Sequence, residues 1–194
     1  SLHLSAKQSN ISSVLEISSK SKKDIGIALS AFNLMIKTKS GKTFSVETAF
    51  QSSKVFENGG PFIDLLEGTS RQAKKDSRLK ESGNLTYFSF YSTKFSLKPR
   101  TFFYDWLYIN ALEQNKTLSN QLLTYNGFSD IEFNSKNSIN CQAYSAALYV
   151  SLISSGQLET AITSPESFQN ILHTEYEKRD KISYKKTYFN KNIR

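Results

Sequence analysis

The segment 43–56, TFSVETAFQSSKVF, constrains the fold more than any other stretch of the chain. Ser45 stands near its start, and a serine oxygen can accept a hydrogen bond from an N–H group of a first helical turn. We predict one helix over 43–56, ended near Glu57 by the Asn-Gly-Gly-Pro run at 58–61. The apolar residues that recur close to the helical period are Val46, Ala49, Phe50 and Val55.

Three polar residues of this predicted helix have a spacing that could serve chemistry. Glu47, Gln51 and Lys54 follow one another at i, i+4 and i+7, so they would share one stripe of a helix. Glu47 would lie in the first turn, where the helix dipole favours a carboxylate. Because charged residues are mostly exposed, a solvated face is the alternative to a functional site.

Length and composition indicate a single α+β domain, mainly helical around a small β-sheet. The chain has 194 residues, and its 38% hydrophobic and 13% aromatic content is enough for a core. Helices are expected at 43–56, 61–66, 70–81, 101–114, 117–125 and 140–154 and within 157–172, and strands at 14–17, 32–36, 42–44, 85–97 and 128–134.

Residue counts argue against several kinds of site. The one cysteine, Cys141, excludes an internal disulfide and is typical of a reducing cytosol. Two histidines, His3 and His173, with one cysteine argue against a His/Cys metal site and against a Ser/His/Asp triad. We therefore expect no metal and no cofactor. No apolar run approaches the length of a membrane span, so we predict a cytoplasmic protein without a membrane partner.

The charge balance favours a polyanionic partner. The net charge is +8, and the segment 174–194 has seven Lys or Arg residues against three Asp or Glu. Aromatic residues are interleaved with these charges and could stack on unpaired bases, although a solvated tail is the alternative. These aromatic residues are Tyr176, Tyr184, Tyr188 and Phe189.

Two residues are unusual in the otherwise apolar segment 101–114, TFFYDWLYINALEQ. A buried carboxylate is costly unless it is paired, so we expect Asp105 either at a solvent-facing helix edge or in a site. Trp106 next to it is either a core residue or a platform for a base.

Several short motifs follow one another in order over about 28–152. They are Leu29-Ser30-Ala31-Phe32, Gly41, Ser45 to Lys54, Ala73-Lys74, Tyr104-Asp105-Trp106, Asp130 to Phe133 and Asn140 to Leu148. This order resembles the NADAR (YbiA-like) family, and FYDWLYINAL with DIEFN and NCQAYSAALY is most similar to the NADAR proteins paired with DarT-type toxins. Those toxins ADP-ribosylate guanine bases in DNA, and the paired NADAR protein removes the modification.

The resemblance implies one YbiA-like domain over 1–194 that hydrolyses the bond between ADP-ribose and guanine and acts as an antitoxin. ADP-ribosylated DNA would be one partner, and the cognate DarT-type toxin a second. Catalytic roles are implied for Glu47, Lys54 and Asp130. Substrate-binding roles are implied for Ser30, Phe32, Gln51, Asp105, Trp106, Asn140 and Gln142.

The implied chemistry suits these residue types. Cleavage of an N-glycosidic bond builds positive charge at the anomeric carbon, which the carboxylate of Glu47 could stabilise, or Glu47 could act as general acid/base. The amine of Lys54 could instead attack the ring-opened sugar and form a Schiff base, for which burial would have to lower its pKa. Asp130 could orient a ribose hydroxyl or a water molecule.

Two departures from the family pattern concern the phosphate side of the site. The usual D-x-x-W-G is D-I-E-F-N from Asp130 onward, and the usual G-x-N-x-L-G is N-S-I-N-C-Q-A from Asn137 onward. Two other functions stay open: a small-molecule N-glycosidase of the riboflavin-pathway type, and a non-catalytic module that binds DNA or the toxin. The basic charge favours the DNA hydrolase over the former, and the Glu47 and Lys54 pair favours an enzyme over the latter.

Overall fold

The computed structural model describes residues 13–130 and 142–180. The chain divides into two compact units, 1–151 and 152–194, which are described separately below. Strands β1 to β7 all lie in the first unit, as do all the residues proposed for the site. In the described part of the chain, no helix is long and apolar enough to cross a membrane.

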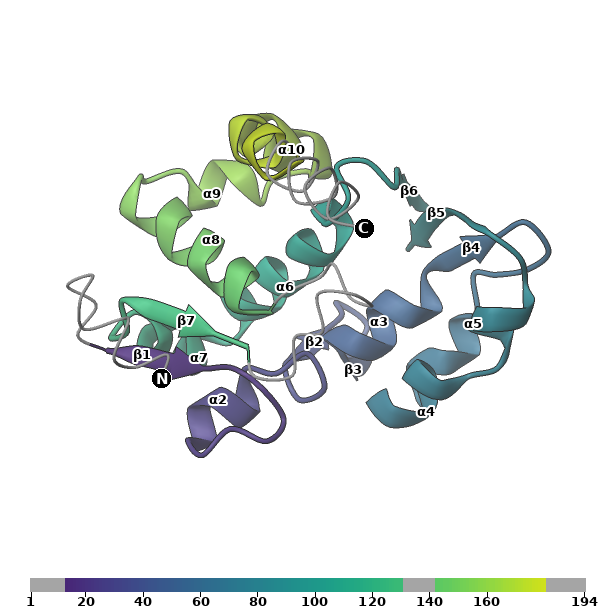
Figure 1. The fold of residues 1–194 in the computed structure, drawn as a ribbon, viewed down its shortest axis with the longest axis horizontal. Coiled ribbons are helices and arrows are strands. Elements are labelled where there is room, and N and C mark those ends of the chain that lie inside the picture. Colours follow the sequence, from purple (N-terminus) through teal and green to yellow (C-terminus); the bar gives the residue numbers. More distant parts are fainter. Residues whose placement is uncertain (1–12, 131–141, 181–194) are drawn as a thin grey trace, which may run out of the picture. The chain divides into compact units, whose positions relative to one another are not determined.

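Helices dominate the first unit, and its strands are short (Figure 1). This confirms the predicted α+β class. In chain order the elements are β1 (Val14–Glu16), α2 (Asp24–Ala28), β2 (Met35–Lys37), β3 (Thr43–Ser45), α3 (Val46–Ser52), β4 (Lys54–Phe56), the 3₁₀ helix η1 (Ile63–Glu67), α4 (Ser70–Lys75), α5 (Arg78–Glu81), β5 (Leu85–Phe90), β6 (Thr93–Phe95), α6 (Phe102–Gln114), α7 (Lys116–Leu122), β7 (Gly127–Ser129) and α8 (Gln142–Ser154), which continues into the second unit.

The strands form three small sheets. Strands β1 and β7 pair in parallel, β2 and β3 form an antiparallel hairpin, and β4, β5 and β6 form an antiparallel sheet in that order. A turn at Ser40-Gly41 joins β2 and β3, where Gly41 has a φ of +85° that suits glycine.

The prediction of one helix over 43–56 is wrong at both ends. Residues 43–45 form β3, and α3 ends at Ser52. The hydroxyls of Ser52 and Ser53 donate to the carbonyl oxygen of Ala49, and the carbonyl of Ser53 accepts from the N–H of Ser89, so the chain leaves the helix for a sheet. Lys54 therefore lies on β4, where it pairs with Phe88, and not on the helical stripe of Glu47.

The predicted cap at Ser45 is confirmed. Its Oγ accepts a hydrogen bond from the N–H of Thr48 at 3.0 Å, so α3 begins where the residue types indicated.

The prediction of one helix over 70–81 is wrong in its middle. Helix α4 ends at Lys75, and the side chain of Asp76 accepts a hydrogen bond from the N–H of Arg78 at 3.0 Å in the break before α5.

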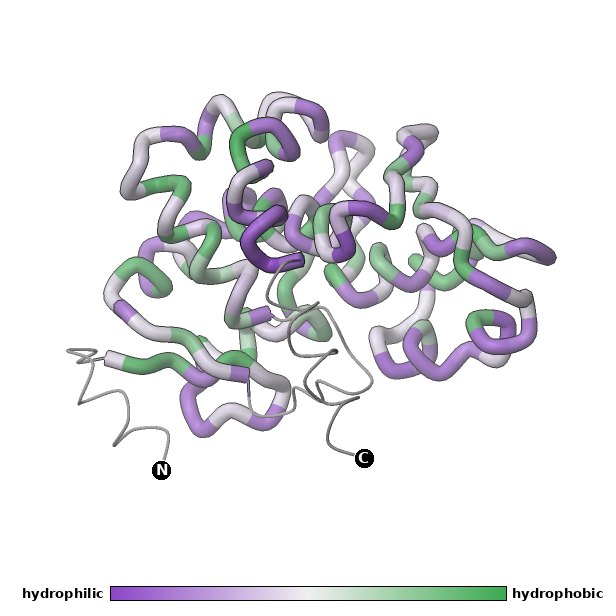
Figure 2. The backbone as a smooth tube through the Cα atoms, turned by 45° about the horizontal axis from the view of Figure 1, so that its top comes forward, coloured by the Kyte–Doolittle hydropathy of each residue, from purple (hydrophilic) through white to green (hydrophobic). Residues whose placement is uncertain are grey.

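An aromatic core joins α3, β5 and α6. The ring of Phe50 lies 5.2 Å from that of Phe88, 6.0 Å from that of Phe103 and 5.3 Å from that of Tyr104. All four side chains are buried. Helix α4, which packs beside α3, is mainly polar, and Ala73 is its one buried residue. The other residues of SRQAKK are hydrophilic, as the purple colour of this segment in Figure 2 shows.

The second unit contains the end of α8, α9 (Leu158–Ala161) and α10 (Pro165–Ile171), and residues 173–180 are also helical. Helix α10 lies within the range 157–172 where a helix was predicted, and it begins at Ser164-Pro165, where Ser164 Oγ accepts from the N–H of Ser167 at 3.1 Å. Tyr176 is only 4% exposed, which corrects its assignment as a base-stacking residue of the basic segment 174–194. Residues 181–194 of that segment lie outside the described residues.

Candidate functional site

The site begins where the segment 29–34 meets the N-terminus of α3. The first N–H groups of a helix have no partner within the helix. Here the N–H of Val46 donates to the carbonyl of Leu34, and that of Glu47 donates to the carbonyl of Ala31, each at 2.9 Å. These main-chain bonds hold Glu47 against the segment 29–34, which explains how two motifs apart in the sequence form one site.

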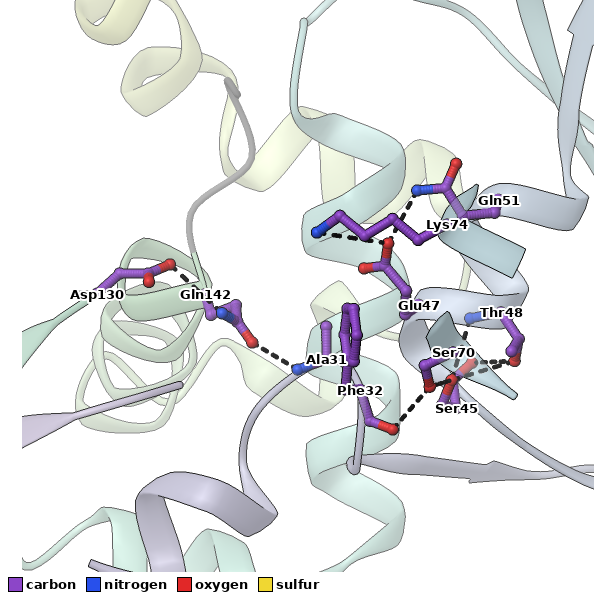
Figure 3. A network of polar contacts seen from close by, with 10 residues as sticks. All are labelled: Ala31, Phe32, Ser45, Glu47, Thr48, Gln51, Ser70, Lys74, Asp130 and Gln142. Atoms are coloured by element: carbon purple, nitrogen blue, oxygen red, sulfur yellow. Dashed lines mark hydrogen bonds and ion pairs between the residues drawn. The ribbon is translucent and has the colours of Figure 1, made fainter. Parts of the chain in front are cut away.

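Three further elements bind the same segment. From α6, the hydroxyl of Tyr108 donates to the carbonyl of Leu29 at 2.7 Å. From α4, the hydroxyl of Ser70 donates to the carbonyl of Phe32 at 2.8 Å and also bonds to Ser45 Oγ. From α8, the amide oxygen of Gln142 accepts from the N–H of Ala31 (Figure 3). Segment 29–34 is therefore fixed by four helices.

Glu47 is a nearly buried acid with two polar neighbours, and its side chain is 7% exposed. Its Oε1 accepts a hydrogen bond from Gln51 Nε2 at 2.9 Å, which confirms that these two residues share one stripe of α3. The Nζ of Lys74 on α4 lies 3.9 Å from the same oxygen, so the carboxylate faces an ammonium group (Figure 3).

The amide of Gln51 is held in one orientation. Because the Glu47 carboxylate accepts hydrogen bonds, the NH₂ group of Gln51 points toward it. The other end of the amide, Oε1, is buried and has no hydrogen-bond partner among the residues that the structure describes. A buried acceptor without a donor is unfavourable, so the site presents an unused hydrogen-bond acceptor beside the acid.

Lys54 reaches the same region from β4. Its ammonium lies 5.1 Å from the centre of the Phe50 ring. Burial lowers the pKa of Lys54 below its usual value of 10.5; the charge of Glu47 opposes this shift, and the charge of Lys74 adds to it. The charges of Glu47 and Lys74 are therefore close enough to act on the Lys54 amine.

A glycine makes the position of Lys54 possible. Gly60 has a φ of +90°, and a Cβ atom there would lie 2.2 Å from the carbonyl oxygen of Lys54. Any other residue at position 60 would displace the backbone of β4. The Gly-Gly-Pro run thus lets the chain turn back directly against the strand that carries the lysine.

Asp130 and Tyr104 are two further titratable residues near this region. Gln142 Nε2 donates to Asp130 Oδ2 at 3.4 Å, so Gln142 links Asp130 to Ala31 (Figure 3). Burial raises the pKa of the Tyr104 phenol well above its usual value, and the negative charges of Glu47 and Asp130 add to the shift. Tyr104 therefore stays neutral and lies within electrostatic reach of both acids.

Asp105 is a buried carboxylate of α6. Of the two expected environments, the solvent-facing edge is excluded, because Asp105 is only 1% exposed. Its Oδ2 accepts from the hydroxyl of Thr101 at 2.7 Å, and its Oδ1 accepts from the hydroxyl of Ser145 on α8 at 2.6 Å. These bonds satisfy the buried carboxylate and tie α6 to α8.

The Asp105→Ala variant should therefore lose stability. Two buried hydroxyls would lose their acceptor, so we expect the free energy of unfolding to fall by about 1–3 kcal/mol. Urea unfolding would measure this, with Glu159→Ala on the exposed face of α9 as the control. If Asp105 acts mainly on substrate, the unfolding free energy would instead stay unchanged while ligand binding is lost.

The remaining predicted site residues differ in accessibility. Ser30 is 1% exposed, and its hydroxyl donates to the carbonyl of Ile27 at 2.7 Å, so it is engaged in the local turn. The Phe32 ring is half-buried, with Lys74 Nζ 5.0 Å from its centre. Trp106 is half-buried on α6. Asn140 lies outside the described residues.

Sequence reasoning did not assign Lys74, Ser70 or Tyr104 to the site. Lys74 and Tyr104 belong to motifs that carry the family resemblance, which was the available signal. Their spacing along the chain contains no indication that they approach Glu47, since the approach depends on how α4 and α6 pack against α3.

Comparison with known proteins agrees with this arrangement. The model of one family, described as DarT1-associated NADAR antitoxin, matches residues 1–182. The match confirms the resemblance seen over 28–152 and includes every residue of the site. No curated protein matches the chain.

Proposed function

Because the chain belongs to the family of DarT1-associated NADAR antitoxins, we propose that it is a glycohydrolase that removes ADP-ribose from guanine bases of DNA. It would thereby reverse the modification made by a DarT-type toxin. One observation carries the proposal: a nearly buried carboxylate, Glu47, and an amine whose pKa is lowered by burial, Lys54, lie within electrostatic reach of each other. A buried amine with a lowered pKa near a carboxylate is typical of catalytic sites.

The reaction is a hydrolysis. The bond between the anomeric carbon of ADP-ribose and a guanine nitrogen breaks, the nitrogen takes a proton, and the carbon takes the oxygen of water. Positive charge develops on the sugar as the bond breaks, and the Glu47 carboxylate would stabilise it. With Gln51 and Lys74 as its neighbours, this carboxylate has a defined position before the substrate binds.

The same glycosidic bond could also be cleaved through a covalent intermediate on Lys54. Its neutral amine would add to the anomeric carbon of the ring-opened sugar, guanine would leave with a proton, and water would then hydrolyse the Schiff base to ADP-ribose and free lysine. The lowered pKa supports this role because a larger share of the amine is neutral. Asp130, held by Gln142, would orient a ribose hydroxyl or the water.

The net charge of +8 supports DNA as the carrier of the modified base, since each phosphate contact with Lys or Arg releases a counterion. A small metabolite would not need this excess. The DarT-type toxin is the second proposed partner, because an antitoxin of this family opposes a DarT1 toxin.

The decisive experiment is incubation of the protein with guanine-ADP-ribosylated DNA, with detection of free ADP-ribose and of restored guanine. We expect release by the wild-type protein. Unmodified DNA and DNA ADP-ribosylated on thymine are the controls for base selectivity. Tight binding of the modified DNA without release would contradict the proposal and favour the non-catalytic module.

A further inference from the structure

The site has two sides of opposite chemistry. On one side, Glu47 and Gln51 are buried and present oxygen acceptors. On the other side, Lys74 presents an ammonium group, and its side chain is 58% exposed. Both sides meet at Glu47 Oε1, where Gln51 Nε2 and Lys74 Nζ converge (Figure 3). A ligand that fits has hydrogen-bond donors at one end and negative charge at the other.

Lys74 is positioned so that its ammonium could exchange the Glu47 carboxylate for a phosphate of a ligand. Four residues before it on α4, Ser70 is bonded to Phe32 and Ser45, which keeps α4 against the site. The ammonium rests 5.0 Å from the Phe32 ring centre and 3.9 Å from Glu47, a distance that exceeds a hydrogen bond. The Lys74 side of this ion pair is exposed to solvent, which weakens a pair of this length, and a phosphate offers a stronger charge-assisted bond.

Lys74 requires an anion on the ligand, whereas Gln51 Oε1 requires a hydrogen-bond donor. Gln51 is 6% exposed, and its Oε1 lacks a donor among the described residues. The bond to Glu47 keeps the NH₂ group turned away, so a ligand atom that meets Oε1 has to be a hydroxyl or an N–H. A phosphate oxygen there would be repelled by Glu47 as well as by this acceptor.

Building on the proposed hydrolase function, we propose that ADP-ribose binds in one direction, with its diphosphate at Lys74 and a hydroxyl of the ribose at the scissile bond donating to Gln51 Oε1. Lys74 leaves Glu47 for the diphosphate when the ligand binds. The Glu47 carboxylate then faces the anomeric carbon and still accepts the hydrogen bond from Gln51. Lys74 and Gln51 are binding residues in this arrangement, and the bond-breaking step stays with Glu47 and Lys54.

The experiment uses two ligands with a diphosphate, of which only one has the sugar at the scissile bond. ADP has the diphosphate and lacks this ribose, and ADP-ribose has both. Titration calorimetry on the full chain gives both affinities without any turnover. We expect Lys74→Gln to weaken both ligands by about tenfold or more, because a charge-assisted bond is lost. We expect Gln51→Met to weaken ADP-ribose by a similar factor and to leave ADP unchanged.

Matched controls separate these effects from general ones. Lys75→Gln removes the same charge from the next exposed residue of α4, and it should leave both affinities within about twofold of the wild type. Gln51→Asn keeps the amide and withdraws it by one methylene group, so it tests the acceptor if the Met variant does not fold.

Three results would overturn the orientation: a Lys74→Gln effect on ADP-ribose alone, a Gln51→Met effect on ADP, or an equal effect of Lys75→Gln and Lys74→Gln. Failure of the wild type to bind either ligand would do so as well. These outcomes are independent of the proposed function, because a protein that binds ADP-ribose as stated and releases none from DNA refutes only the hydrolysis.

Discussion

Replacement of Lys54 by methionine is expected to lower kcat/KM on guanine-ADP-ribosylated DNA by about a hundredfold or more, the size typical of a lost nucleophilic or acid/base group. Methionine keeps the apolar stem of the side chain beside Phe50 and removes the amine. Lys54→Arg should not restore activity, because a guanidinium stays charged at neutral pH and is not a nucleophile. Lys75→Met on the exposed face of α4 is the control.

A chemical trap gives a second measurement of the same role. Cyanoborohydride reduces a Schiff base to a stable secondary amine, so the wild-type protein should acquire ADP-ribose covalently at Lys54 during turnover, as seen by mass spectrometry. Full activity of Lys54→Arg, or labelling of another lysine in place of Lys54, would show that the amine is not the nucleophile.

The lowered pKa of Lys54 also determines how stability depends on pH. Between the lowered folded pKa and the usual value of 10.5, the unfolded chain binds more protons at this group than the folded chain does. The free energy of unfolding of the wild type should therefore rise with pH across this window relative to Lys54→Met. Below the window, the wild type carries the cost of a buried charge that the variant lacks. Urea unfolding of both proteins over a pH series measures the difference.

Replacement of Glu47 by glutamine should also reduce turnover by about a hundredfold or more, because the negative charge opposite the developing positive charge disappears. The variant keeps the shape of the side chain, and its amide oxygen can still accept the bond from Gln51. Folding should therefore be retained, which a thermal melt would show. Glu67→Gln, an exposed residue at the end of η1, is the matched control.

The pH profile distinguishes the role of Glu47 from a purely structural one. The charge of Glu47 raises the pKa of Lys54, so its removal should lower that pKa further. The residual activity of Glu47→Gln should accordingly rise at a lower pH than that of the wild type. An unchanged rate for Glu47→Gln would contradict the mechanism, and so would a rate loss that matches a loss of folded protein.

The sequence by itself determined the features that depend on residues close together in the chain. The cap at Ser45 was predicted from residue type and position, and it is confirmed. Helix α6 begins within one residue of its predicted start and ends where predicted. A cap or an apolar period involves residues within a few positions of each other, so a short window of sequence contains all the partners. The order of the motifs likewise sufficed to identify the family.

Only the tertiary structure decided where several site residues lie. The apolar period of 43–56 indicated a helix, and pairing of Lys54 with Phe88 on β5 ended that helix at Ser52. The polarity of Asp105 indicated a site or a solvent edge. In the folded protein, the hydroxyl of Ser145 on α8 donates to its carboxylate and so lowers the free-energy cost of its burial.

The ion pair between Glu47 and Lys74 and the lowered pKa of Lys54 have the same origin. Each depends on groups from α3, α4 and β4 that approach one another only after the chain has folded. The residue types that carry the chemistry can be read from the sequence. The distances, burial and charges that make them a site come from packing between segments far apart in the chain.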